Sequence, residues 1–86
     1  MLRVNVTTVG SVAELRIEGC IASHAASELW KECRRQVRTG RCLRLDLAGV
    51  TLVDQASVVK LKLLVRQGAE VVNASLLVSA LLTDDP

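Results

Sequence analysis

The chain has 86 residues, of which half are hydrophobic, and its 11 Lys and Arg against 9 Asp and Glu give a net charge of +2. This length supports one domain, and the mixed charges with a single aromatic residue, Trp30, argue against nucleic-acid binding. No apolar run approaches the roughly 20 residues that cross a bilayer, and the first ten residues have no apolar signal core. We therefore expect a cytoplasmic protein without direct membrane insertion.

Two segments with alternating apolar and polar residues open the chain. Residues 2–8 and 12–18 both follow the two-residue period of a half-buried strand. A Val-Gly-Ser turn around Gly10 separates them, and Gly19 is expected to end the second segment. The pattern predicts an antiparallel hairpin.

A helix is predicted next, with Ser23 as its N-cap and Gly40 as its stop. Cations crowd its C-terminal end, where they suit the helix dipole. Apolar residues at three- and four-residue spacing predict one buried face. This face comprises Ala26, Leu29, Trp30, Cys33 and Val37.

The remaining elements alternate strand and helix. We expect a strand over 42–47, a link over 48–53, a helix over 55–67, a strand over 69–72 and a helix over 76–82. Either Asn73 or Ser75 would cap the last helix.

The predicted order is therefore β-β-α-β-α-β-α. Strands that are joined through helices pair in parallel by right-handed crossovers. The fold class is α/β: a single domain over 1–82 with a four-stranded mixed sheet, built from an N-terminal antiparallel hairpin and parallel βαβ units. Residues 83–86 form a polar C-terminal tail.

Residues that could bind a metal or act as a base are few. The three cysteines, Cys20, Cys33 and Cys42, form no CxxC pair, and we interpret them as reduced thiols rather than zinc ligands or a disulfide. His24 falls in the first turn of a predicted surface helix and is interpreted as solvated. No cofactor or metal is expected.

Asp46 and Asp54 could form a catalytic pair of carboxylates. Asp46, however, lies within a predicted strand, and Asp54 is suited to cap the following helix with its own side chain. Nothing in the pattern requires catalysis, so we expect no enzyme.

Four segments in order carry a resemblance to a known family. They are LRIEG at 15–19, SELW at 27–30, LRLDLAGVTLVDQASVVKL at 43–61 and GAEVVNAS at 68–75. Together they resemble the STAS domain, the fold shared by anti-sigma-factor antagonists and sulfate-transporter tails. The resemblance implies a regulatory, protein-binding module in bacterial sigma-factor signalling, whose partner is an anti-sigma factor, a histidine-kinase-like ATPase.

The resemblance also implies a partner-reading corner around Asp54, which matches the family's strand-end Asp. In phospho-regulated antagonists the next residue is a Ser or Thr that the partner kinase phosphorylates. Here that position is Gln55, and Ser57 matches a position usually held by Gly. We therefore expect no phosphorylation at the usual position, with Ser57 as the nearby fallback.

The helix over 55–67 predicts two different faces. Its core face is expected to hold Val58, Leu61, Leu64 and Val65. Gln55, Val59 and Leu63 recur every four residues on another face, which Lys62 and Arg66 flank. This second face is either an interaction site or part of a broad core stripe. The predicted partner-binding set is Asp54, Gln55, Ser57, Val59, Lys62, Leu63 and Arg66.

Two other functions remain open. Small STAS proteins also bind the ATPase of bacterial phospholipid-transport ABC systems, and Trp30 directly after Leu29 resembles that group. A small-molecule binder or enzyme could instead use the strand ends as a crevice, although convergent polar groups are lacking.

Overall fold

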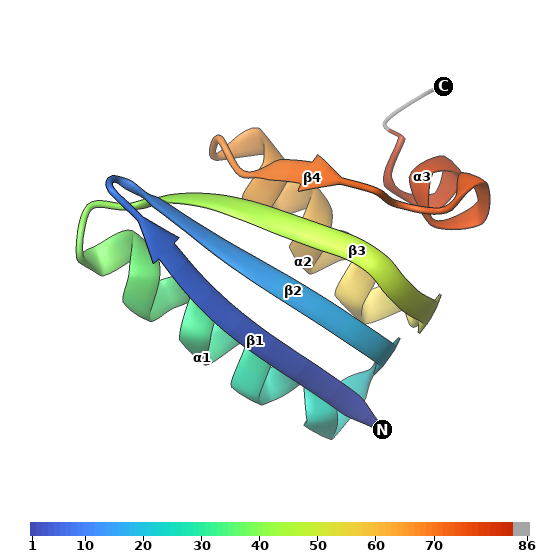
Figure 1. Ribbon diagram of the computed structural model, residues 1–86. Coiled ribbons are helices and arrows are strands. Elements are labelled where there is room, and N and C mark those ends of the chain that lie inside the picture. Colours follow the sequence, from blue (N-terminus) through green and yellow to red (C-terminus); the bar gives the residue numbers. More distant parts are fainter. Residues whose placement is uncertain (84–86) are drawn as a thin grey trace.

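One mixed sheet with helices on one face organises the described part of the chain (Figure 1). The computed structural model describes residues 1–83, apart from the side chain of Ser23. Its elements are β1 (Leu2–Val9), β2 (Val12–Ile21), α1 (Ser23–Arg38), β3 (Cys42–Val53), α2 (Gln55–Arg66), β4 (Glu70–Val72) and α3 (Leu76–Leu82). The strands lie in the order β1-β2-β3-β4; β1 and β2 are antiparallel, and the other pairs are parallel. The predicted order and mixed sheet are confirmed.

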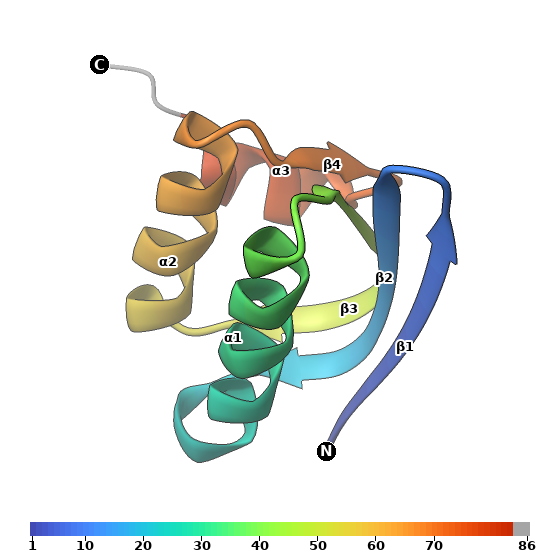
Figure 2. The same cartoon turned by 90° about the vertical axis from the view of Figure 1, so that its left-hand side faces the viewer.

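The core lies between the sheet and helices α1 and α2, which lie side by side on one face of it (Figure 2). In β2, Leu15 and Ile17 point into this core and are fully buried, while Arg16 between them is exposed. The opposite face of the sheet carries ion pairs, among them Arg44 with Glu70 at 3.1 Å between Nε and Oε1. The sheet thus has one apolar and one charged face, as antiparallel and mixed sheets commonly do.

Strand β2 runs past Gly19, which was expected to end it. Gly19 has a φ of +101° and pairs with Leu2, and a Cβ added there would collide with the carbonyl oxygen of Met1. A residue without a side chain is therefore needed at this close approach, and the strand continues to Ile21. Gly19 is thus required by the close approach of Met1, and it does not end the strand.

Strand β3 is twice as long as expected, because the predicted link over 48–53 is also strand. Its pairing with β2 slips by one residue after Asp46 and again after Val50, so β3 holds two extra residues. At the first slip the Asp46 carboxylate accepts a hydrogen bond from the Ala48 N–H, 3.0 Å away. Such bulges break the two-residue alternation, which explains why the pattern ended at Leu47.

Helix α1 differs from prediction at its start and along its buried face. It begins at Ser23, so the N-cap is Ala22, which makes no side-chain capping bond, and the prediction of Ser23 as the cap was wrong. Near the C-terminal end, Val37 is 53% exposed, whereas Gln36 is only 8% exposed. The prediction that Val37 lies on the buried face was therefore wrong, and the buried face includes Gln36, a polar residue that was not predicted there.

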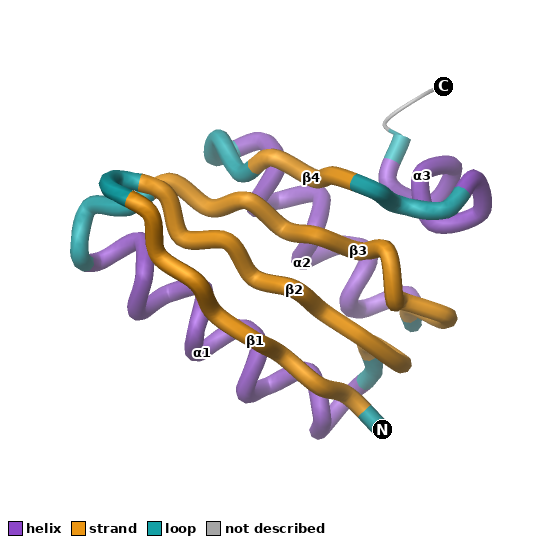
Figure 3. The backbone as a smooth tube through the Cα atoms, viewed as in Figure 1, coloured by secondary structure: helices purple, strands orange, loops and turns teal. Residues whose placement is uncertain are grey.

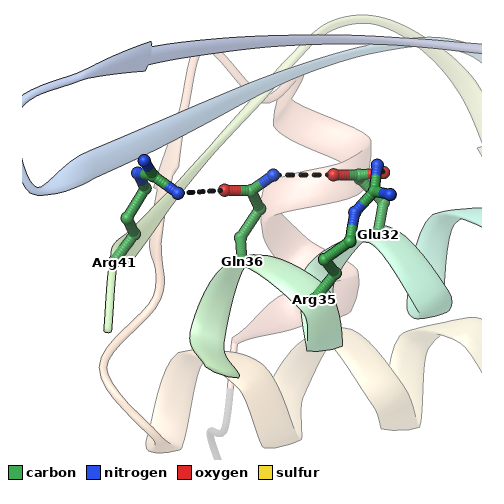
Figure 4. Close-up of polar contacts among 4 residues, drawn as sticks. All are labelled: Glu32, Arg35, Gln36 and Arg41. Atoms are coloured by element: carbon green, nitrogen blue, oxygen red, sulfur yellow. Dashed lines mark hydrogen bonds and ion pairs between the residues drawn. The ribbon is translucent and has the colours of Figure 1, made fainter. Parts of the chain in front are cut away.

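Hydrogen bonds explain why Gln36 tolerates burial (Figure 4). Its amide donates to Glu32, 2.7 Å away, and accepts from Arg41 at 3.4 Å. Glu32 also accepts from Arg35 at 2.8 Å. The bond from Gln36 is the main cause that lowers the pKa of the Glu32 carboxyl below its usual value, so this glutamate stays charged.

The last elements agree closely with expectation. Helix α3 has the predicted bounds, and Ser75 caps it by accepting a hydrogen bond from the Val78 N–H at 3.1 Å. In α2 one predicted core residue, Val65, is 43% exposed, because it lies in the last turn near the end of the helix. Of the predicted polar tail, only Thr83 falls within the described residues.

Candidate protein-binding site

The junction between β3 and α2 is fixed by Asp54. Its extended backbone is that of an N-cap, and its carboxylate accepts a hydrogen bond from the Ser57 N–H at 2.8 Å. Its own N–H donates to the carbonyl oxygen of Ile21 at 3.0 Å, which ties the junction to the end of β2. Asp54 therefore sets where α2 starts and how its first turn is presented.

The first turn of α2 presents Gln55 and hides Ser57. Gln55 is exposed, whereas Ser57 is only 2% exposed. The polar group at the surface of this corner is thus an amide, and the nearby hydroxyl lies beneath it. Of the seven residues predicted to bind a partner, Ser57 is the one that does not reach the surface.

Two aliphatic side chains stand out from α2 next to this corner. Val59 is 63% exposed and Leu63 is 50% exposed, and a spacing of four residues places them one above the other. Lys62 is half-buried beside them and Arg66 is exposed one turn further on. We call the surface of Gln55, Val59, Lys62, Leu63 and Arg66 the α2 face. Val59 and Leu63 thus lie outside the core stripe, on a face of their own.

A groove of about 230 Å³ between α1 and α2 adjoins the α2 face. Leu63 belongs to both surfaces, because it forms one wall of the groove opposite Trp30 and Val37. The charged residues in the lining are Arg34 and Lys60, both cations. Sequence reasoning missed this groove; the available signal was the apolar Val37 at the margin of the predicted buried face.

Other reactive side chains are dispersed or already engaged. Cys33 is buried, and burial raises the pKa of its thiol to about 11, whereas Cys42 is exposed. Asp46 is 3.9 Å from Arg16 and also holds the bulge in β3, so it and Asp54 both have structural partners. Across residues 1–83 there is no cluster of three or more His, Cys, Asp or Glu side chains that could hold a metal ion.

The helices are also short relative to the thickness of a bilayer. In the part of the chain that the structure describes, none is both long and apolar enough to cross a membrane.

Comparison with known proteins bears on the fold. No protein-family model and no curated protein matches the chain. Among solved structures, it is similar to the crystal structure of an antisigma-factor antagonist, a STAS domain from Rhodobacter sphaeroides. The TM-score is 0.59 at 24% identity, and the match covers 87% of this chain and 92% of the other. The chain therefore has the STAS fold that the four sequence segments predicted.

Proposed function

We propose that this protein is a non-enzymatic regulatory module, similar to anti-sigma-factor antagonists, that binds a protein partner in the cytoplasm through the α2 face. The observation that carries the proposal is the exposure of Val59 and Leu63, one turn apart, beside the capped corner at Asp54. Contiguous exposed apolar patches with a polar rim mark many interaction sites.

The chemistry of the α2 face suggests how such a partner would bind. Val59 and Leu63 would fill an apolar pocket on the partner, since fully desolvated side chains near the centre of an interface contribute most of the affinity. Lys62 and Arg66 flank them and favour a partner with acidic groups around that pocket. Gln55 adds an amide that both donates and accepts hydrogen bonds.

Gln55 also bears on how the module would be regulated. Phosphorylation at this corner would place nearly two negative charges at a helix start and change which partner docks. An amide cannot accept that group, and the Ser57 hydroxyl is buried. We therefore propose that the module remains able to bind its partner at all times. Binding would then be regulated through the partner.

Two classes of partner fit this proposal. The first is an anti-sigma factor, a histidine-kinase-like ATPase, which the resemblance to antagonists favours. The second is the ATPase of a phospholipid-transport ABC system. Trp30 supports it, because it lines the groove that shares Leu63 with the α2 face, so that one partner could contact both residues.

The proposal is tested by placing a charge on the α2 face. Leu63→Glu should change the free energy of unfolding by no more than about 0.5 kcal/mol, as exposed substitutions usually do. It should weaken partner binding more than about 100-fold, because docking would bury an unpaired carboxylate. Circular dichroism melts measure the first effect, and co-purification with either candidate ATPase from the native cell measures the second.

Two control variants on the same helix separate folding from binding. Leu61→Glu places the charge at a fully buried position and should unfold the domain. Val65→Glu should preserve binding, because Val65 is similarly exposed but lies two residues on, about 200° around the helix. Binding that survives Leu63→Glu, or that is lost equally in Val65→Glu, would contradict the proposed surface.

A further inference from the structure

The outer edge of β1 is open. Within the described residues β1 pairs only with β2, so the backbone groups on its other side have no strand beside them (Figure 3). The strand is eight residues long and contains one charged residue, Arg3, and no proline. The opposite edge of the sheet is the three-residue strand β4. Long edges with few charges and no proline favour pairing with another strand, whereas short edges discourage it.

A hollow runs along this edge between β1 and α1. It has a volume of about 420 Å³, and Val4 and Val6 supply its apolar wall. Val4 is half-buried and Val6 is 38% exposed, so the apolar side of β1 is only partly covered. Four charged residues of α1 form the other wall: Glu28, Lys31, Glu32 and Arg35.

We propose that β1 and α1 form the interface of a two-fold symmetric homodimer, in which the β1 strands of two copies pair antiparallel. With the symmetry axis at Asn5, Val4 of each copy faces Val6 of the other, and Arg3 faces Thr7. Opposed residues of antiparallel strands share a face of the sheet, so the four valines form one apolar row above the two hollows. No like charges meet along the strands.

The charges of α1 fit the same symmetry. Helix α1 runs in the direction of β1 (Figure 1), and the hollow places the middle of β1 against residues 28–35 of the helix. Two copies related by an axis at Asn5 therefore bring their α1 helices side by side and antiparallel. Glu28 then faces Arg35 of the second copy, and Lys31 faces Glu32. Along α1 these charges follow the order acidic, basic, acidic, basic. This order is complementary to itself only when the second helix runs in the opposite direction. We therefore identify the partner at this edge as a second copy of this chain.

Three of these four side chains are freely accessible for contacts across the axis, and the Glu32 side chain is 19% exposed. At present Lys31 lies 3.6 Å from Glu28 and Arg35 lies 2.8 Å from Glu32, both within α1, and three of the four side chains are more than 70% exposed. Gln36 and Arg35 hold the carboxylate of Glu32 in place (Figure 4). Each charge can therefore keep its partner within the helix and gain a second partner in the other copy.

The first test is the mass of the protein in solution as its concentration is raised. Sedimentation velocity should show conversion to a species of twice the 9.3 kDa chain mass. Val6→Lys should raise the dissociation constant more than about 100-fold, since two ammonium groups would be buried beside the axis. Val65→Lys is the matched control on α2, with a similarly exposed valine, and should dimerise normally.

A charge exchange on α1 provides a second test that leaves β1 intact. Glu28→Lys or Arg35→Glu alone opposes like charges twice across the axis and should weaken dimerisation about 10-fold. The double variant Glu28→Lys/Arg35→Glu restores opposite charges across the axis and should recover dimerisation. Within one helix, however, the double variant places like charges beside Lys31 and Glu32. If the four charges acted only within their own helix, the double variant would therefore dimerise less well than either single variant.

The outcomes decide the proposal independently of partner binding by the α2 face. A single species of one chain mass at all concentrations up to about 1 mM would overturn it. So would a dimer that Val6→Lys leaves intact while circular dichroism shows a folded chain. Should Val6→Lys fail to fold, the charge exchange decides: a double variant that dimerises no better than the single ones refutes the interface.

Discussion

Neither Gln55 nor Ser57 combines the two properties that phosphorylation at the start of α2 requires, an accessible side chain and a hydroxyl group. Gln55 is accessible but has no hydroxyl, and Ser57 has a hydroxyl but is 2% exposed. We expect incubation with ATP and a cognate kinase to leave the intact mass unchanged. Gln55→Ser is the matched variant: it places a hydroxyl at the accessible position and should gain one phosphate. A stoichiometric phosphate on Ser57 in the unmodified protein would show that the first turn of α2 opens readily.

The cysteines provide a residue-scale check of the buried face of α1. Cys33 is 2% exposed and the pKa of its thiol is raised to about 11, so it should react slowly with thiol reagents at neutral pH. Cys42 is exposed and should react first. Mass spectrometry after timed labelling distinguishes the two, and rapid labelling of Cys33 in the folded protein would contradict the packing of α1.

At this scale the helical period left two alternatives for Val59 and Leu63, an interaction face or part of a broad core stripe. Both residues are exposed, which favours the first alternative. The prediction that Val37 is buried was wrong, and the burial of Gln36 was not predicted, because apolar periodicity does not show that an amide will hydrogen-bond to Glu32 and Arg41.

Among the elements, β3 depends on Asp46 for its irregular path. Asp46 is 7% exposed, and its carboxylate accepts a hydrogen bond from the Ala48 N–H in the bulge and lies 3.9 Å from Arg16. Asp46→Ala should lower the free energy of unfolding by about 1–3 kcal/mol, because a backbone donor loses its acceptor. Asp46→Asn retains an acceptor oxygen and should cost less. Urea denaturation measures both, and equal losses would show that the charge, rather than the hydrogen bond, stabilises the bulge.

The same element shows where sequence reasoning about strands stops. Regular alternation identified β1, the first part of β2 and residues 42–47, and turn residues placed the hairpin. The second half of β3 has its buried residues, Leu47, Val50 and Val53, three apart, a spacing that two bulges produce and that no strand template contains.

For the molecule as a whole, burial of the Cys33 thiol links stability to alkaline pH. Folding raises the pKa of this thiol from 9.0 to about 11, so above pH 9 the unfolded chain releases the proton while the folded chain retains it. The stabilising contribution is complete below pH 9 and should be lost towards pH 11, by about 2–3 kcal/mol. Urea unfolding across this range should show a shallower decline for Cys33→Ala; an identical decline would exclude Cys33 as the cause.

The topology of the whole molecule followed from the sequence because crossover rules leave few alternatives once the element order is known. The surfaces did not follow in the same way. The α1–α2 groove and the hollow beside β1 depend on how far apart two elements settle, which is decided by side chains from both. Only the α2 face could be inferred from the spacing of residues, because it lies within one helix.

The position of the single aromatic side chain has a practical consequence. Trp30 is the sole strong ultraviolet fluorophore of the chain, and it lines the α1–α2 groove across from Leu63. Its emission wavelength reports how wet its surroundings are, so a ligand that covers this groove would shift the spectrum towards the blue. The fluorescence of Trp30 can therefore report binding beside α2, and titrations of the unlabelled protein can be followed without any added dye.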